Sequence, residues 1–181
     1  MTDGLAEALA AHDRFERSRV TSHEERQDTF HEERQNPPGD DHQDAFVPTQ
    51  VTFDARVYVE SDGVTIVNVV PTLDAAVSGE TVAPVVEDGW YDTFERRVEG
   101  IGGVTTTDDV TVTAVDRGAE TVTVETALDA SPGTVADDVV AVVSFVEGTW
   151  VEGIIPGYDY VDTVERVRQR ARQNAQGSTE A

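Results

Sequence analysis

Alternating apolar and polar residues predict two β-hairpins in the chain. Residues 51–59 and 64–70 alternate as half-buried strands do, and a Ser-Asp-Gly turn at 61–63 separates them. The same alternation recurs over 110–115 and 121–126, again with a glycine in the connecting segment. One face of each predicted strand is therefore expected to point into a core.

A three- and four-residue spacing of apolar positions predicts a helix after each hairpin. The first covers 82–98, and Gly89 is the place where it could be interrupted. The second is expected to begin with Ser131 as its N-cap and Pro132 as its first residue, and its apolar stripe continues to Trp150. Both helices have an apolar side that can pack on a sheet.

These elements predict an α+β domain over residues 46–172. Its order is ββα-ββα, with an antiparallel sheet of about four strands and helices packed on one face of that sheet. A last helix capped by Asp159 or Asp162 completes the domain, and residues 173–181 are polar enough to predict a disordered tail.

Residues 1–45 differ in composition and predict a polar N-terminal arm that is mostly helical or disordered. This segment holds all four histidines and few large apolar residues, so it is not expected to bury a core of its own. A helix is predicted over about 3–19. The sequence His-Glu-Glu-Arg-Gln occurs twice, at 23–27 and at 31–35.

The charge of the chain indicates the solvent in which it works. The chain has 36 acidic residues, 13 arginines and no lysine, and its formal net charge is −23. At molar salt the Debye length falls to roughly 3 Å and self-repulsion is screened, so this composition predicts a halophilic protein. The negative charge also disfavours nucleic acid and anionic membrane surfaces as partners.

The sequence lacks the residue types that several kinds of catalytic and metal site require. The chain has no cysteine, and residues 46–181 contain no histidine, which excludes thiolate metal sites and a Ser-His-Asp triad within the domain. The HEER copies do not form the zinc motif HExxH, because Gln27 stands where the second histidine is needed. We therefore expect no metal and no cofactor. No apolar run approaches the roughly 18 residues of a membrane helix, and the N-terminus lacks a signal-peptide pattern, so a cytoplasmic protein is expected.

The most specific candidate site lies in residues 145–160, where aromatic and acidic side chains surround three glycines and a proline. These side chains predict a binding site with no catalytic residue, formed by Trp150, Glu152, Tyr158, Asp159 and Tyr160. The same residues allow a structural alternative, in which Trp150 fills the core and the acids are solvated like the others on this surface.

Two further alternatives assign other residues. Glu147 and Glu152 could act as the acid and base of a carboxylate-dependent hydrolase, but they lie about 140° apart on a continuous helix and share a site only if Gly148 breaks it. The arginines near the C-terminus could contact nucleic acid, although they also suit the negative end of a helix dipole. These arginines are Arg166, Arg168, Arg170 and Arg172.

A family of small acidic haloarchaeal proteins of unknown function resembles this chain in two segments, PTLDAAVSGETVAPVVEDGWYDTFERRV and FVEGTWVEGIIPGYDY. The resemblance covers about Val51 to Arg172. It implies an origin in a halophilic archaeon and a single α+β domain, and it implies no activity, substrate or catalytic residue. We expect a non-enzymatic cytoplasmic binding or adaptor domain, chaperone-like or ligand-binding, whose partner is a protein or a small ligand.

Overall fold

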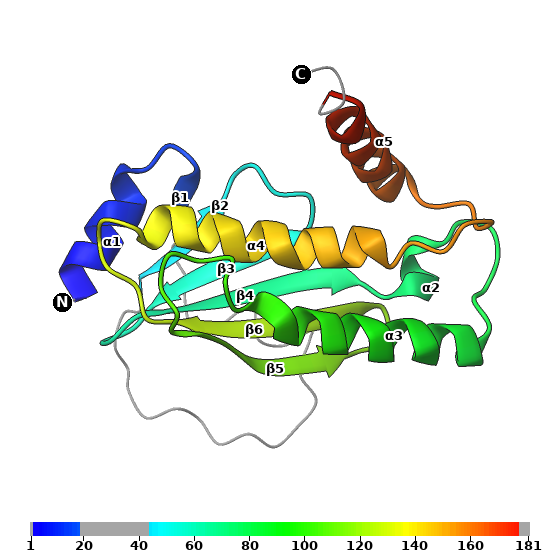
Figure 1. The fold of residues 1–181 in the computed structure, drawn as a ribbon, viewed down its shortest axis with the longest axis horizontal. Helices are drawn as coiled ribbons and strands as arrows, with labels where there is room; N and C mark the ends of the chain where they lie inside the picture. The colour runs from blue at the N-terminus through cyan, green and yellow to red at the C-terminus, as the bar shows by residue number, and fades with distance from the viewer. Residues whose placement is uncertain (1, 19–43, 178–181) are drawn as a thin grey trace.

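The computed structural model describes residues 2–18 and 44–177, and these build a six-stranded antiparallel sheet with helices packed on it (Figure 1). The strands lie in the order β1-β2-β3-β4-β6-β5, and each runs opposite to its neighbours. Their bounds are β1 Phe15–Ser18, β2 Ala45–Pro48, β3 Asp54–Val59, β4 Val64–Pro71, β5 Val110–Arg117 and β6 Thr121–Leu128. The predicted α+β class is confirmed, but the expected number of about four strands is too low.

The two predicted hairpins form the centre of the sheet. In the first, Val57 of β3 lies opposite Ile66 of β4, and both side chains are fully buried. The second hairpin, β5 and β6, joins the first through the pairing of β4 with β6. Gly63 lies in the first turn, where a Cβ would be 2.4 Å from the Leu128 carbonyl oxygen, so this close approach requires glycine.

Helices follow each hairpin, as the periodicity predicts. α2 Leu73–Ala76 and α3 Pro84–Val98 follow the first hairpin, and α4 Val135–Glu152 and α5 Asp162–Gly177 follow the second. A further helix, α1 Thr2–Ala11, precedes the sheet, and a 3₁₀ turn at Glu99–Ile101 ends α3. α3 runs through Gly89 without interruption. α4 begins later than predicted, because the Ser131 carbonyl closes a turn onto Thr134 and Val135, and Thr134 occupies the N-cap. In the described ranges, none of these helices is both long enough and apolar enough to cross a bilayer.

The N-terminal segment, expected as a polar arm, contributes a helix and a strand to the fold. The helix prediction over 3–19 is wrong beyond Ala11, because Phe15 begins a strand that pairs with β2. Leu5, Leu9 and Phe15 are buried in the same core as residues of β3, β4 and α4. These few apolar residues are enough to hold the N-terminal segment on the domain, because they add to a core that β3, β4 and α4 already form. The two HEERQ copies lie outside the described residues.

Two clusters of buried side chains lie between the sheet and the helices, and α4 contributes to both. The first joins α1 and α4 to β2, β3 and β4. The second joins α3 and α4 to the other end of the sheet, and it contains Trp90, Phe94 and Trp150. Figure 1 shows α3 and α4 side by side on one face of the sheet, with α5 projecting beyond it. The second cluster is therefore where α3 and α4 meet.

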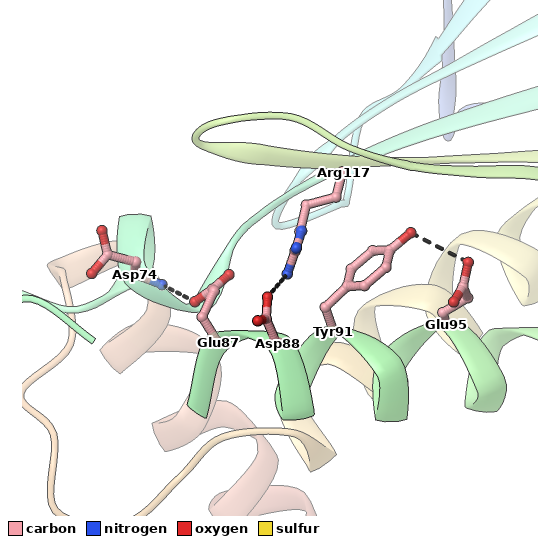
Figure 2. Close-up of polar contacts among 6 residues, drawn as sticks. All are labelled: Asp74, Glu87, Asp88, Tyr91, Glu95 and Arg117. Carbon is pink, nitrogen blue, oxygen red and sulfur yellow. Dashed lines mark hydrogen bonds and ion pairs between the residues drawn. The ribbon is translucent and has the colours of Figure 1, made fainter. Parts of the chain in front are cut away.

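Polar contacts hold α3 to its neighbours (Figure 2). Arg117 of β5 forms an ion pair with Asp88 at 2.9 Å, and its guanidinium lies 4.7 Å from the centre of the Tyr91 ring. Glu87 accepts a hydrogen bond from the backbone N–H of Asp74 at 2.8 Å, which connects α3 to α2. These contacts fix the position of α3 relative to β5 and α2.

Candidate functional site

Two of the five predicted binding residues belong to the core. Trp150 is fully buried, and its indole Nε1 donates to the Pro71 carbonyl oxygen at 2.8 Å. Tyr160 is also buried, and its hydroxyl donates to the carbonyl oxygen of Ile155 and accepts from the N–H of the same residue. These bonds fasten α4 and the loop after it, so both side chains have structural partners.

The other three predicted residues have different surroundings. Tyr158 is half-buried against the cluster that contains Trp150. Asp159 is exposed, and its backbone carbonyl accepts a hydrogen bond from the N–H of Ser78 at 2.7 Å. Glu152 is exposed on the last turn of α4, beside α3. Of the five residues, only Glu152 lines the groove between α3 and α4.

This open groove of about 400 Å³ lies between α3, the last turn of α4 and the segment 153–156, and we call it the α3–α4 groove. Val85 on its rim is 77% exposed, the most exposed large apolar side chain in the described ranges. An apolar hollow of this size can receive a small ligand or a few side chains of a partner. Its apolar lining consists of Val85, Val86, Trp90, Phe94, Ile154 and Ile155.

Trp90 forms part of the groove wall and carries an unpaired donor. Its ring stacks on Phe94 with the ring centroids 5.5 Å apart, and only 5% of the residue is exposed. Its Nε1 has no hydrogen-bond partner in the described part of the chain. Gly153 lies against this nitrogen, since a Cβ there would be 2.8 Å from it. A buried N–H without an acceptor costs about 1–3 kcal/mol, so this site lacks one acceptor.

Gly89 also lines the groove, and it lies inside α3, where glycine is about 1 kcal/mol less favourable than alanine. Its φ is not positive, and a Cβ there would meet no atom within 4 Å. Neither the backbone conformation nor packing among the described residues requires glycine at this position. The missing side chain leaves the groove open at the middle of α3.

Arg97 and Glu152 form the charged part of the groove. Nη1 of Arg97, in the last turn of α3, lies 4.0 Å from Oε2 of Glu152, and the side chains are 47% and 74% exposed. The ion pair between Arg117 and Asp88 is much shorter, at 2.9 Å. An exposed and loose pair such as Arg97–Glu152 adds less than about 1 kcal/mol to stability, so a ligand can open it readily.

Glu147 has a structural role that separates it from Glu152. Its Oε1 accepts hydrogen bonds from the backbone N–H groups of Thr52 at 2.5 Å and Phe53 at 2.9 Å, just before β3. α4 continues through Gly148, so the two glutamates stay about 140° apart around the helix. Of these two glutamates, Glu152 lines the groove and Glu147 does not. The geometry gives no support to a paired acid and base.

The described structure gives no support to a metal site or to a special role for the arginines of α5. Within residues 2–18 and 44–177, no group of three or more histidine and acidic residues is arranged to hold a metal ion. Arg166 donates to a carbonyl one turn earlier in α5, and Arg168 pairs with Glu165 at 2.5 Å. The side chains of Arg170 and Arg172 lie outside the described part of the structure. Nucleic-acid contact by this helix therefore stays an untested alternative.

The sequence model of one protein family matches residues 11–170, a range that includes all six strands of the sheet and the α3–α4 groove. The chain belongs to DUF5813, a family of unknown function. The predicted resemblance to a family of unknown function is thereby confirmed, whereas an origin in a halophilic archaeon stays a prediction. Neither curated proteins nor solved structures gave a match. The function of this DUF5813 protein is therefore argued from the groove itself.

The groove residues that were not predicted as site residues include Gly89, Trp90 and Arg97. The available signal was Gly89, a glycine inside an otherwise periodic apolar stripe. Its interpretation as a break in the helix is wrong, because α3 is continuous there. Trp90 lies in the same stripe, and a stripe alone does not distinguish a core residue from one that borders a groove.

Proposed function

We propose that this DUF5813 protein is a non-enzymatic, cytoplasmic binding domain that holds an apolar segment of a partner polypeptide in the α3–α4 groove. The observation that carries the proposal is Nε1 of Trp90, which lies in the wall of an apolar groove and has no acceptor among the described residues. An apolar residue of a polypeptide has both groups that this groove can bind, an apolar side chain and a carbonyl oxygen. Its side chain covers the apolar lining, and its carbonyl oxygen accepts the N–H of Trp90.

The shape of the groove favours a polypeptide over an enclosed small molecule. Pockets for small ligands bury most of the ligand surface and have volumes of about 300–1,000 Å³. The α3–α4 groove is open along one side, and its volume of about 400 Å³ is near the low end of that range. A polypeptide can insert one or two side chains and leave the rest of its surface outside. Val85 and Gly89 on the rim would then contact the bound chain.

The position of Gly153 defines how a ligand reaches the donor. In the free protein Gly153 shields Nε1 of Trp90. A carbonyl oxygen therefore reaches this nitrogen only when the segment 153–156 moves outward. We expect the backbone amide of Gly153 to change its environment on binding, together with the indole of Trp90.

NMR spectroscopy of the two indole N–H groups tests this proposal. The chain has only two tryptophans, and a Trp90→Phe variant assigns their signals. We expect a pool of acetylated peptides that end in apolar residues to shift the Trp90 signal in a saturable way. The Trp150 signal should shift much less, because Trp150 keeps its bond to the Pro71 carbonyl.

Gly153→Ala is the variant that should block binding, because its Cβ would press against Nε1 of Trp90 at 2.8 Å and occupy the path of a carbonyl oxygen. Gly148→Ala is the matched control, since Gly148 has open space around its Cβ and does not line the groove. We expect Gly148→Ala to bind the peptide pool as the wild type does. A pool that moves neither indole signal, or an unchanged titration of Gly153→Ala, would show that the groove is not the binding site.

A further inference from the structure

We propose that the α3–α4 groove is specific for the free carboxyl-terminal end of its partner polypeptide, and that Arg97 binds the terminal carboxylate. This inference rests on the proposed function, because it names the part of a polypeptide that the same groove takes. It depends on three side chains, those of Arg97, Glu152 and Trp90.

Arg97 is placed to bind a carboxylate, and its guanidinium has N–H donors available for one. It lines the groove together with Trp90 and Phe94 of the same helix. Its side chain is 47% exposed, and its ion pair with Glu152 spans 4.0 Å. A guanidinium has five N–H donors and can hold a carboxylate through two parallel hydrogen bonds. A ligand carboxylate can therefore make shorter and better aligned bonds than Glu152 makes.

The chemistry of a chain terminus fits this arrangement of groups. A carboxyl-terminal residue carries an apolar side chain and a carboxylate on one α-carbon, whereas the side chains of Asp and Glu bring the charge without the apolar group. From Trp90 to Arg97, α3 rises about 10 Å, which is the length of about three extended residues. A terminal carboxylate at Arg97 therefore places the last few side chains over Phe94 and Trp90. A carbonyl of the same segment can then accept the N–H of Trp90.

On this acidic protein, Arg97 is what makes the groove suited to a carboxylate. With a formal net charge of −23, the protein repels anions over most of its surface. Among the residues that line the groove, Arg97 is the cation. Glu152 competes with the ligand for this guanidinium, but it is 74% exposed and can return to water at small cost when the ligand enters. Glu152 thus acts as a displaceable counter-ion.

The test compares one peptide pool in two forms. Acetylated peptides that end in apolar residues are made with a free acid and with an amide at the C-terminus, and each pool is titrated while the Trp90 signal is followed. We expect the acids to bind about fivefold more tightly than the amides, the upper range for an exposed ion pair. Arg97→Gln should remove this difference. Arg96→Gln changes the neighbouring arginine outside the groove lining and should preserve it.

Glu152→Gln gives a second readout that a folding defect cannot imitate. Removal of the competing carboxylate should tighten the binding of the acids and leave that of the amides unchanged. Equal binding of acids and amides to the wild type, with the Trp90 signal still moving, would overturn the specificity for a carboxyl terminus and leave the proposed function standing. A Trp90 signal that moves with neither pool would overturn the proposed function itself.

Discussion

The indole rings of Trp90 and Trp150 pack edge to face, with their centroids 6.2 Å apart and their planes inclined by 71°. The two N–H groups nevertheless differ, because Trp150 donates to the Pro71 carbonyl oxygen and Trp90 has no acceptor in the described part of the chain. One ring fastens α4 to the end of β4, and the other brings an unpaired donor to the wall of the α3–α4 groove. A groove kept open for a ligand should lower the stability of the free protein, and this loss can be measured.

Gly89→Ala is expected to raise the free energy of unfolding by about 0.5–1 kcal/mol and to weaken peptide binding. The gain in stability arises because alanine restricts the unfolded chain, while no atom lies within 4 Å of the new Cβ. Binding weakens because the methyl group enters the groove. Urea unfolding measures the first quantity, and titration with the peptide pool measures the second.

Gly148→Ala is the control for this stability effect. Gly148 is also inside a helix with open space around its Cβ, but it lies outside the groove lining. We expect a similar gain in the free energy of unfolding with unchanged peptide affinity. A loss of affinity in both variants, or in neither, would contradict the role assigned to Gly89.

Glu147→Ala should destabilise the fold by about 1–3 kcal/mol, because the backbone N–H groups of Thr52 and Phe53 lose their shared acceptor. Glu147→Gln keeps an oxygen at this position and should lose less. Glu152→Ala should change the free energy of unfolding by less than about 0.5 kcal/mol, since this side chain is mostly exposed. Equally small effects at both glutamates in urea unfolding would show that Glu147 does not hold the start of β3.

High pH should destabilise the protein through two tyrosines, the buried Tyr160 and the half-buried Tyr91. Burial raises the pKa of Tyr160 above its ordinary value of 10.0, and burial together with Glu95 raises the pKa of Tyr91 in the same direction. The folded state then keeps these phenolic protons at a pH where the unfolded chain releases them. The free energy of unfolding should therefore be unaffected by these groups below pH 10 and fall as pH rises above it, by at most about 1.4 kcal/mol per pH unit for each tyrosine.

The absence of lysine makes this alkaline range easy to interpret, because no ammonium side chain titrates there. Tyr160→Phe and Tyr91→Phe should each reduce the slope of the free energy of unfolding against pH, whatever they do to stability at neutral pH. The measurement is urea unfolding at several pH values above 9. A slope that both variants leave unchanged would assign the alkaline loss to another cause.

Potassium chloride should stabilise the fold, if the excess of acidic residues is a response to salt. With 36 acidic residues against 13 arginines, self-repulsion is strongest at low ionic strength. The Debye length falls from about 10 Å at 0.1 M to about 3 Å at 1 M, so most of the gain should appear over that range. Sorbitol at equal osmolality is the control, because it carries no charge and does not screen. A midpoint of thermal unfolding that is the same at low and molar salt would refute the halophilic interpretation.

The central hairpins and their helices were predictable because each depends on a hydrophobic period within one continuous stretch. Val57 and Ile66 lie on alternating runs that are long enough to read, and their side chains are buried as the pattern predicts. β1 and β2 were missed, since a strand of four residues has too few positions to show alternation. Their pairing also joins residues on opposite sides of the segment 19–43.

The sequence predicted the region of the candidate site but not most of the residues that form it. Residues 145–160 do border the groove, and Glu152 lines it. Composition could not tell that Trp150 and Tyr160 would find acceptors inside the core, because Pro71 and Ile155 become partners only after the loop and the sheet have packed. Trp90 comes from a different helix, so no pattern within 145–160 could include it.

Patterns along the chain were sufficient for the α+β class, for the two central hairpins and the long helices that follow them, and for the lack of cysteine and lysine. Each of these depends on composition or on residues close in sequence. The folded structure was needed to show that Gly153 lies against Trp90, that Glu147 caps the start of β3, and that Arg97 faces Glu152. The physical reason is that periodicity reports which side of an element is buried, whereas the partner of that side is set by packing between distant parts of the chain.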